Sequence, residues 1–482
     1  MNELAFATID ELKSKLASKE ISREELLTFF INRFKKYDSQ LGAALEIFDK
    51  DSILERSSQE GFLAGIPGIL KDNIAQEGRT LTCASKILEG FVSPYDATVS
   101  KRLKKGGALL IGRANMDEFA MGASTEYSSY FKTHNPWNLD HVPGGSSGGS
   151  IAAVAAGLVP WALGSETGGS VRLPAAFCGI VGLKPTYGLN SRFGLVAYAS
   201  SFDQIGIATR TVKDNAHVLS VIAGKDECDS TTVDIGKKDY TKNLDGVFPK
   251  GLTIGIIDNM LNAEGMMPEV RELVENAIKE FEKLGAVIKS VKIPVVDYSA
   301  AVYFILSRAE AASNLARFDG VRYGYRDKKV QTLDEMYRET RHDGFGAEVR
   351  LRILTGNYVL SAGHAADFYN NAKKVQQLMR AKLDETFKGV DLLLTPTQGA
   401  PAFKFGAYDA DHLQLDLMDF FTCFANITGV PGLALPAGFS KNNLPIGFQL
   451  IGPHLSEELL YQVGYAYEQK TPWHKMQLPL FM

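Results

Sequence analysis

The most unusual stretch of this sequence is His141-Val142-Pro143-Gly144-Gly145-Ser146-Ser147-Gly148-Gly149-Ser150. It is followed by an apolar run of helical character, 151–156. A second glycine-rich stretch comes soon afterwards, Gly164-Ser165-Glu166-Thr167-Gly168-Gly169-Ser170-Val171-Arg172. Glycines let the backbone adopt conformations closed to other residues, and serines at a helix start can expose their hydroxyls. Because successive N–H groups of such a turn can converge on an anion, Ser170 is expected to lie beside an oxyanion hole.

A third element lies upstream, where the apolar segment 65–70 is followed by Lys71. We interpret this segment as a strand that delivers the lysine toward the protein interior. A desolvated lysine loses proton affinity and can serve as a base. Asp72 is adjacent, but on an extended strand its side chain would point to the other face. The three elements together predict a serine nucleophile with a neutral lysine nearby.

Other chemistries compete for these residues. Segment 144–148 also fits G-x-S-x-G, the nucleophile elbow of α/β-hydrolases, which needs a strand directly before it. Here 135–140 is a poor strand, and none of the eight histidines stands in a recognisable context for a Ser-His-Asp triad. The phosphate-binding pattern G-x-x-x-x-G-K-[ST] is missing from the sequence. For either segment taken alone, glycines that only form tight turns are a structural alternative, but the two segments together with Lys71 count against it.

The ordered set of Lys71, GGSSGGS at 144–150 and GGS at 168–170 resembles the amidase signature family, including the 24-residue step from Ser146 to Ser170. The resemblance implies a large mixed β-sheet covered by helices on both faces. It also implies a Ser-cisSer-Lys triad, with Ser170 as nucleophile, Ser146 as the bridging serine after a cis peptide bond, and Lys71 as base. The implied oxyanion hole is the backbone of Thr167, Gly168 and Gly169.

Three further segments, 115–122, 191–201 and 317–325, are similar to the A subunits of bacterial glutamyl-tRNA(Gln)/aspartyl-tRNA(Asn) amidotransferases. This similarity implies a glutaminase whose ammonia converts Glu-tRNA(Gln) to Gln-tRNA(Gln), or Asp-tRNA(Asn) to Asn-tRNA(Asn). By position, Arg352 would pair with the α-carboxylate of glutamine, Asp419 would hold its α-ammonium, and Tyr303 would contact the substrate. An arginine fork suits a carboxylate, and a zwitterion needs both signs of charge.

The same similarity implies B and C subunits as partners. The B subunit would bind the tRNA and use ATP and magnesium, so that this chain needs no cofactor or metal of its own. Three residues depart from the family pattern: Glu166 stands where Asp is usual, Leu173 where Gln is usual, and Phe424 where Pro is usual.

Composition fits this assignment. The 482 residues are 45% hydrophobic and 22% charged, and the net charge is −4. Without a basic excess, we expect tRNA to bind mainly through the B subunit. Four cysteines form no CxxC pair, and we interpret them as buried thiols of a reducing compartment. The first residues lack signal-peptide character, and the longest apolar run, 151–163, is too short to span a membrane. We therefore expect a cytoplasmic enzyme without membrane contact.

Short apolar runs alternate with helical stretches, which favours an α/β fold. We expect strands at 108–111, 252–257, 390–394 and 447–451, and helices at 269–284 and 365–387. Capping-box patterns at 8–11 and 22–25 predict two early helix starts. The chain is expected to form a single amidase domain, 1–482, with surface insertions at about 224–251 and 326–346.

Two other functions stay open at this stage. The chain could be a stand-alone amidase that acts on another carboxamide, or a non-catalytic scaffold for assembly. The presence of Lys71, Ser146 and Ser170 counts against the scaffold.

Overall fold

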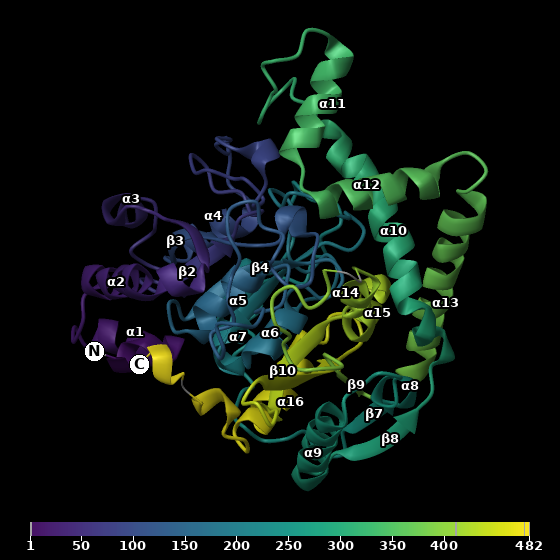
Figure 1. Cartoon of the computed structure of the whole chain (residues 1–482). Coiled ribbons are helices and arrows are strands. Elements are labelled where there is room, and N and C mark those ends of the chain that lie inside the picture. The colour runs from purple at the N-terminus through teal and green to yellow at the C-terminus, as the bar shows by residue number, and fades with distance from the viewer. Residues whose placement is uncertain (1, 410–411, 477, 482) are drawn as a thin grey trace.

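A single mixed sheet organises the chain in the computed structural model, which describes residues 2–409, 412–476 and 478–481. Its strand order is β1-β3-β2-β4-β6-β5-β10-β11-β9-β7-β8, and helices surround it (Figure 1). The strands are β1 Ala44–Ile47, β2 Pro67–Lys71, β3 Leu109–Ala114, β4 Trp161–Glu166, β5 Val181–Lys184, β6 Gln204–Thr209, β7 Thr253–Ile257, β8 Val287–Val291, β9 Leu392–Pro396, β10 Gly432–Phe439 and β11 Pro445–Ile451. The predicted large mixed sheet is confirmed.

The helices are α1 Ile9–Ala17, α2 Arg23–Leu41, α3 Lys50–Glu55, α4 Thr98–Lys105, α5 Gly148–Ala155, α6 Arg172–Cys178, α7 Val212–Ile222, α8 Asp258–Leu261, α9 Pro268–Leu284, α10 Ser299–Asn314, α11 Leu333–Gly344, α12 Ala347–Leu360, α13 Asn371–Thr386, α14 His412–Leu417, α15 Phe420–Thr428 and α16 Glu457–Glu468. All four expected strands and the helix at 269–284 are found within a few residues of their predicted bounds. The helix expected at 365–387 is divided into a π-helical turn, Ala366–Asn370, and α13.

Alternating side chains along the central strands enter two separate cores. In β4, Trp161 and Leu163 join one apolar cluster, whereas Ala162 between them joins the other. Successive strand residues point to opposite faces, so the two clusters lie on opposite faces of the sheet. The residues of α5 belong to the Ala162 side, and those of α7 belong to the Trp161 side. The helices therefore cover both faces, as the resemblance implied.

The sheet brings the two glycine-rich segments to Lys71. Strands β2 and β4 are parallel neighbours, with Leu70 opposite Leu163, so both strands end at the same edge. Gly68 in β2 allows this close approach, because an added Cβ would lie 2.1 Å from the Trp161 ring. Lys71 ends β2, and the turn that leads to Ser170 follows the end of β4. The carboxyl ends of neighbouring parallel strands are where open α/β sheets place their sites.

Local sequence signals at the N-terminus are confirmed. Thr8 and Ser22 both form complete capping boxes, with Glu11 and Glu25 as their partners. The apolar run 151–163 is buried throughout, as expected for core. The interpretation of all four cysteines as buried thiols is wrong for Cys228, which is exposed in an irregular surface segment, whereas the other three are buried.

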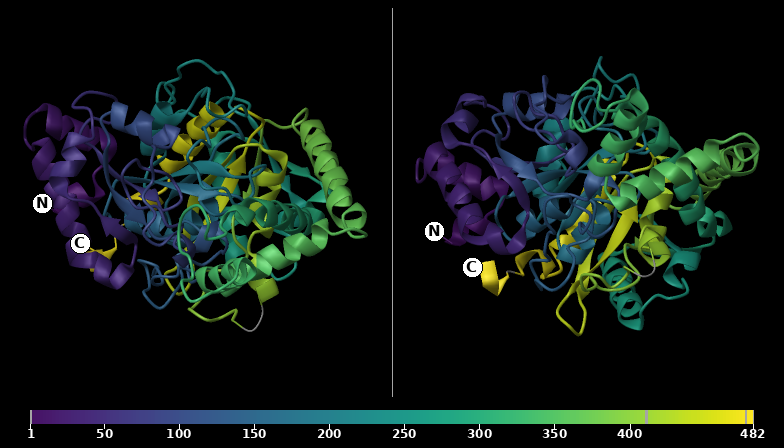
Figure 2. Two further views of the ribbon diagram at one scale, coloured as in Figure 1. Left: turned by 90° about the horizontal axis from the view of Figure 1, so that it is seen from above. Right: turned by 45° about the horizontal axis from the view of Figure 1, so that its top comes forward.

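Of the two expected insertions, 224–251 is largely irregular and exposed, and 326–346 contains α11. The assignment of 1–482 to one domain stays a prediction. The N- and C-terminal ends lie close together on one side of the molecule in all the views (Figures 1 and 2). There the Arg33 guanidinium donates to the carbonyl of Phe481 at 2.7 Å. In the described part of the chain, we find no helix with the length and apolar character that a membrane crossing requires.

Candidate active site

Lys71 is fully buried at the end of β2 and is surrounded by oxygen atoms of the two glycine-rich segments. Its Nζ lies 2.7 Å from Ser146 Oγ, 2.9 Å from Ser147 Oγ and 3.1 Å from the carbonyl oxygen of Ser165. The Ser147 hydroxyl donates to that same carbonyl at 3.1 Å. Three oxygens from these two segments thus fix the position of one amine.

Counting hydrogens assigns a direction to each of these contacts. A neutral lysine amine has two N–H groups and one lone pair. The Ser165 carbonyl can only accept, and Ser147 has already given its proton to it, so both N–H groups of Lys71 are occupied. The lone pair is then left for the Ser146 hydroxyl, which donates to it. This is the arrangement that a base acting on Ser146 requires.

The electrostatics agree with a neutral amine. Burial lowers the pKa of Lys71 from 10.5 to about 7, although the charges of Asp117, Asp203 and Glu166 partly oppose the shift. The neighbouring carboxylate, Asp72, instead accepts hydrogen bonds from Arg113 and Thr82. The expectation that Asp72 points away from Lys71 is confirmed. A lysine without an ion-pair partner can lose its proton near neutral pH.

Ser146 follows a cis peptide bond, Gly145–Ser146, as the resemblance implied. Its carbonyl accepts from the N–H of Asp117 at 3.1 Å. The Asp117 carboxylate in turn accepts from the backbone of Thr125 and Tyr127. Gly145 is required here, because a Cβ would lie 2.1 Å from Asp117 Oδ2. The segment that carries Ser146 is therefore packed directly against a buried carboxylate.

Ser170 is the one member of the triad with measurable exposure, 5%, against 0% for Lys71 and Ser146. Its carbonyl accepts from the N–H of Ser147 at 3.2 Å, which ties the two serine-bearing segments together. Within the described residues, the N–H groups of Thr167 and Gly168 donate to no acceptor, and neither does that of Gly169. Unpaired N–H donors just before the nucleophile can form an oxyanion hole.

A buried ion pair holds this turn from both ends. Glu166, at the end of β4, accepts from the backbone N–H groups of Val171 and Arg172 at 3.1 and 3.0 Å. It also pairs with the Arg172 guanidinium, which reaches the carbonyl of Thr422 and the side chain of Asn426. The arginine charge keeps the pKa of Glu166 below its usual value despite burial. Glu166 therefore connects the two ends of the turn, although the family usually has Asp at this position.

Two of the three predicted substrate residues pack against the turn that contains Thr167, Gly168 and Gly169. A Cβ added to Gly168 would meet the Tyr303 ring at 2.5 Å, and one added to Gly169 would meet Asp419 Oδ1 at 2.9 Å. Tyr303 comes from α10, and Asp419 is the residue before α15. Burial holds the pKa of Tyr303 well above its usual value, so its hydroxyl stays protonated. Both side chains therefore pack against the turn that leads to Ser170.

Arg352, on α12, contacts Glu348 and Tyr198. Its Nε donates to Glu348 at 2.7 Å, and its Nη1 donates to the Tyr198 hydroxyl at 3.0 Å. Tyr198 donates onward to Ser307 on α10, the helix that carries Tyr303. Arg352 is 6% exposed. Arg352 is thus held by an ion pair with Glu348 and is linked through Tyr198 to α10.

Sequence reasoning missed several supporting residues. Ser147 and Ser165 lie inside the quoted glycine-rich segments, but no spacing rule marks them as contacts of Lys71. Asp117 and Tyr198 lie inside the segments 115–122 and 191–201 and were assigned no role. The remaining departures from the family pattern, Leu173 and Phe424, are both buried in apolar surroundings.

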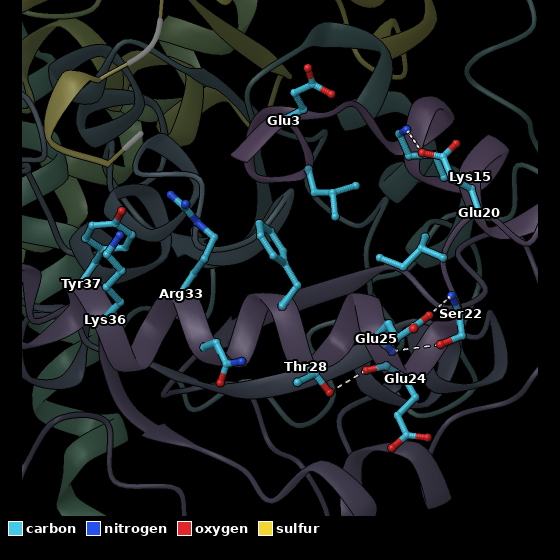
Figure 3. A pocket seen from close by; sticks show the side chains of 14 residues that line it. Glu3, Lys15, Glu20, Ser22, Glu24, Glu25, Thr28, Arg33, Lys36 and Tyr37 are labelled. Carbon is cyan, nitrogen blue, oxygen red and sulfur yellow. Dashed lines mark hydrogen bonds and ion pairs between the residues drawn. The ribbon is translucent and has the colours of Figure 1, made fainter. Parts of the chain in front are cut away.

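A cavity of about 1040 Å³ lies along α2, where Lys15 pairs with Glu20 and Glu25 pairs with Ser22, and it contains no member of the triad (Figure 3). Over the described ranges, we find no group of three or more His, Cys, Asp or Glu side chains arranged to hold a metal ion.

Comparison with known proteins agrees with this geometry. Residues 25–461 match the Amidase family, and the chain belongs to that family. A peptide amidase of Stenotrophomonas maltophilia has 30% identity and a TM-score of 0.80, and the match covers 96% of this chain and 97% of the other.

Within this family, the chain groups with the A subunits of glutamyl-tRNA(Gln) amidotransferase. Such a subunit from Halothermothrix orenii is 50% identical over 97% of this chain and 98% of the relative. The crystal structure of the Thermotoga maritima subunit has 42% identity and a TM-score of 0.84, and covers 99% of this chain and 98% of the other. A subunit of this kind is part of a multi-subunit enzyme.

Proposed function

We propose that this chain hydrolyses glutamine and supplies the ammonia to a tRNA-dependent amidotransferase. One observation supports the chemistry most strongly: a buried lysine amine lies 2.7 Å from Ser146 Oγ, and the N–H of Ser147 holds the carbonyl of Ser170 against the same segment. The substrate assignment rests on Arg352 and Asp419, which carry opposite charges and both act electrostatically on Tyr303, together with the relatives described above.

In the first half of the reaction, Ser170 Oγ attacks the side-chain carbonyl carbon of glutamine. Its proton passes to Ser146 Oγ, and the Ser146 proton passes to the lone pair of Lys71. The carbonyl oxygen becomes an oxyanion, which the N–H groups of Thr167, Gly168 and Gly169 stabilise. When the C–N bond breaks, the proton held by Lys71 returns through Ser146 to the nitrogen, and ammonia leaves.

In the second half, water replaces the amine. The neutral Lys71 takes a proton from water through Ser146, and the hydroxide attacks the glutamyl ester on Ser170. The C–O bond to Ser170 breaks, the serine recovers its proton, and glutamate leaves. The same three groups therefore serve both half-reactions, first as base and then as acid.

The finer assignments belong to the same proposal. B and C subunits complete the enzyme, and the B subunit holds most of the tRNA and uses ATP and magnesium. This chain contributes no cofactor, and the complex works in the cytoplasm. The acceptor is Glu-tRNA(Gln), as in the name of the relatives, or Asp-tRNA(Asn).

The test compares the chain alone with the chain assembled with B and C. Glutamate formation from glutamine and amidation of Glu-tRNA(Gln) are measured for wild type, Ser146→Ala and Ser150→Ala. Ser150 is a matched control, because it is buried in the same segment but donates to the carbonyl of Leu163. We expect Ser146→Ala to lose glutamine hydrolysis and Ser150→Ala to keep it.

Each alternative has its own outcome. A stand-alone amidase would cleave other amides without the B and C subunits and would never support tRNA amidation. A scaffold would assemble and release no glutamate from glutamine. Either result contradicts the proposal.

A further inference from the structure

Asp203 is a buried carboxylate that joins two walls of the site. Its Oδ1 accepts from the Thr167 hydroxyl at 2.7 Å. Its Oδ2 accepts from the backbone N–H groups of Tyr198 and Ala199 at 2.9 and 3.0 Å. The residue is 4% exposed. Thr167 belongs to the oxyanion turn after β4, whereas Tyr198 and Ala199 belong to the loop before β6, so one side chain fixes both segments.

Tyr198 extends this connection to Arg352. The Tyr198 hydroxyl accepts from Arg352 Nη1 at 3.0 Å and donates to Ser307 Oγ at 3.2 Å. The guanidinium carbon also lies 5.7 Å from the centroid of the Tyr198 ring, which is within cation–π range. Any shift of Arg352 toward a substrate carboxylate therefore acts on Tyr198, whose backbone Asp203 holds.

We propose that Asp203 is a positioning residue that couples recognition of the substrate's α-carboxylate at Arg352 to the geometry of the oxyanion hole at Thr167. The inference rests on the proposed glutaminase function. When glutamine seats its carboxylate, Arg352 and Tyr198 become fixed, and Asp203 transmits that constraint to the turn. With an amide that lacks the α-carboxylate, Arg352 and Tyr198 do not become fixed in this way.

The consequence is that binding energy at the amino-acid end of glutamine raises kcat and does not only lower KM. Remote binding energy raises kcat when it is used to order the reacting centre. Oxyanion donors are sensitive to such ordering, because misplacement by about 1 Å can cost about 100-fold in rate. Coupling between two sites typically amounts to about 5- to 150-fold.

The experiment uses the assembled enzyme and two amides at saturating concentration. Glutamine carries both charged groups, and 4-aminobutyramide lacks only the α-carboxylate. Ammonia release is measured for wild type and Asp203→Asn, with Asp214→Asn as the matched control. Asp214 is an equally buried carboxylate on α7, where it accepts from the N–H of Ile9.

Coupling predicts that Asp203→Asn lowers kcat for glutamine by at least about tenfold and lowers kcat for 4-aminobutyramide by a clearly smaller factor. Asp214→Asn leaves both rates unchanged. Equal losses with the two amides would overturn the coupling and leave Asp203 a purely structural residue. A wild type that releases no ammonia from glutamine would instead contradict the proposed function, and the coupling with it.

A second set of variants leaves Asp203 in place. Thr167→Val breaks the inner link, and Tyr198→Phe breaks the outer hydrogen bond. With glutamine, kcat of the double variant should be no lower than kcat of the less active single variant, because both substitutions break the same connection. Thr167→Ser keeps the hydroxyl and should restore the kcat ratio of the two amides. Fully additive losses would refute the coupling.

Discussion

Replacing Lys71 with Met tests whether the buried amine is neutral. The ordinary pKa is 10.5 and the folded value is about 7. Between these values the unfolded chain holds a proton that the folded chain has lost, so stability rises with pH by about 1.36 kcal/mol per pH unit. Below pH 7 both states are protonated, and burial of Lys71 then costs on the order of 4 to 5 kcal/mol.

Methionine removes this dependence. From pH 7.5 to pH 9.5, wild type should gain about 2.7 kcal/mol of unfolding free energy relative to Lys71→Met. All other titrating groups are common to both proteins and cancel in the difference. Three hydrogen bonds of Lys71 are lost as well, at about 1 kcal/mol each, but this loss does not vary with pH.

The assay is urea unfolding at several pH values, followed by tryptophan fluorescence, together with glutamine turnover. Lys184→Met is the matched control, because burial also lowers the pKa of Lys184 to about 7 and its Nζ donates to the Pro185 carbonyl. Both variants should flatten the pH dependence. Only Lys71→Met should lose turnover, by at least about 100-fold. Parallel stability curves for wild type and Lys71→Met would refute the neutral-base reasoning.

Further variants separate the nucleophile, the substrate pocket and the turn. Ser170→Ala should abolish glutamine hydrolysis while the complex still assembles on a sizing column and still amidates its tRNA from ammonium chloride. Arg352→Ala and Asp419→Ala each unpair a desolvated charge, which costs about 2 to 5 kcal/mol, so kcat/KM for glutamine should fall by well over tenfold. Ammonium chloride should restore tRNA amidation, and failure to rescue an assembled Arg352→Ala complex would remove that residue from the glutamine pocket. Gly168→Ala would place a Cβ 2.5 Å from the Tyr303 ring, so it should lower kcat with glutamine by at least about tenfold, and unchanged kinetics would contradict the packing of this wall.

The parts of the site that were predictable from sequence are those encoded locally. Glycine-rich turns and an apolar strand that ends in a lysine indicate Ser170 and Lys71, and the resemblance to the amidase signature family adds Ser146 and the roles of all three. The capping boxes at Thr8 and Ser22 are equally local, since each depends on residues three positions apart.

The supporting contacts were not predictable, because they join segments that are distant in the chain. The bond from Thr167 to Asp203 spans 36 residues, and that from Arg352 to Tyr198 spans 154. No sequence pattern predicts which distant segments come into contact, because the contacts depend on how the strands are ordered in the sheet. The pair of Arg352 with Glu348 is different, because its four-residue helical spacing could have been noticed.

The most direct test of the central claim is to identify the residue that bonds to the substrate carbon. A glutamine analogue with an electrophilic carbon at the amide position is incubated with the assembled enzyme, and the labelled peptide is sequenced by mass spectrometry. The geometry predicts one label, on Ser170 Oγ, which forms in wild type and not in Ser170→Ala. A label on Ser146 or on a cysteine would contradict the assignment of the nucleophile.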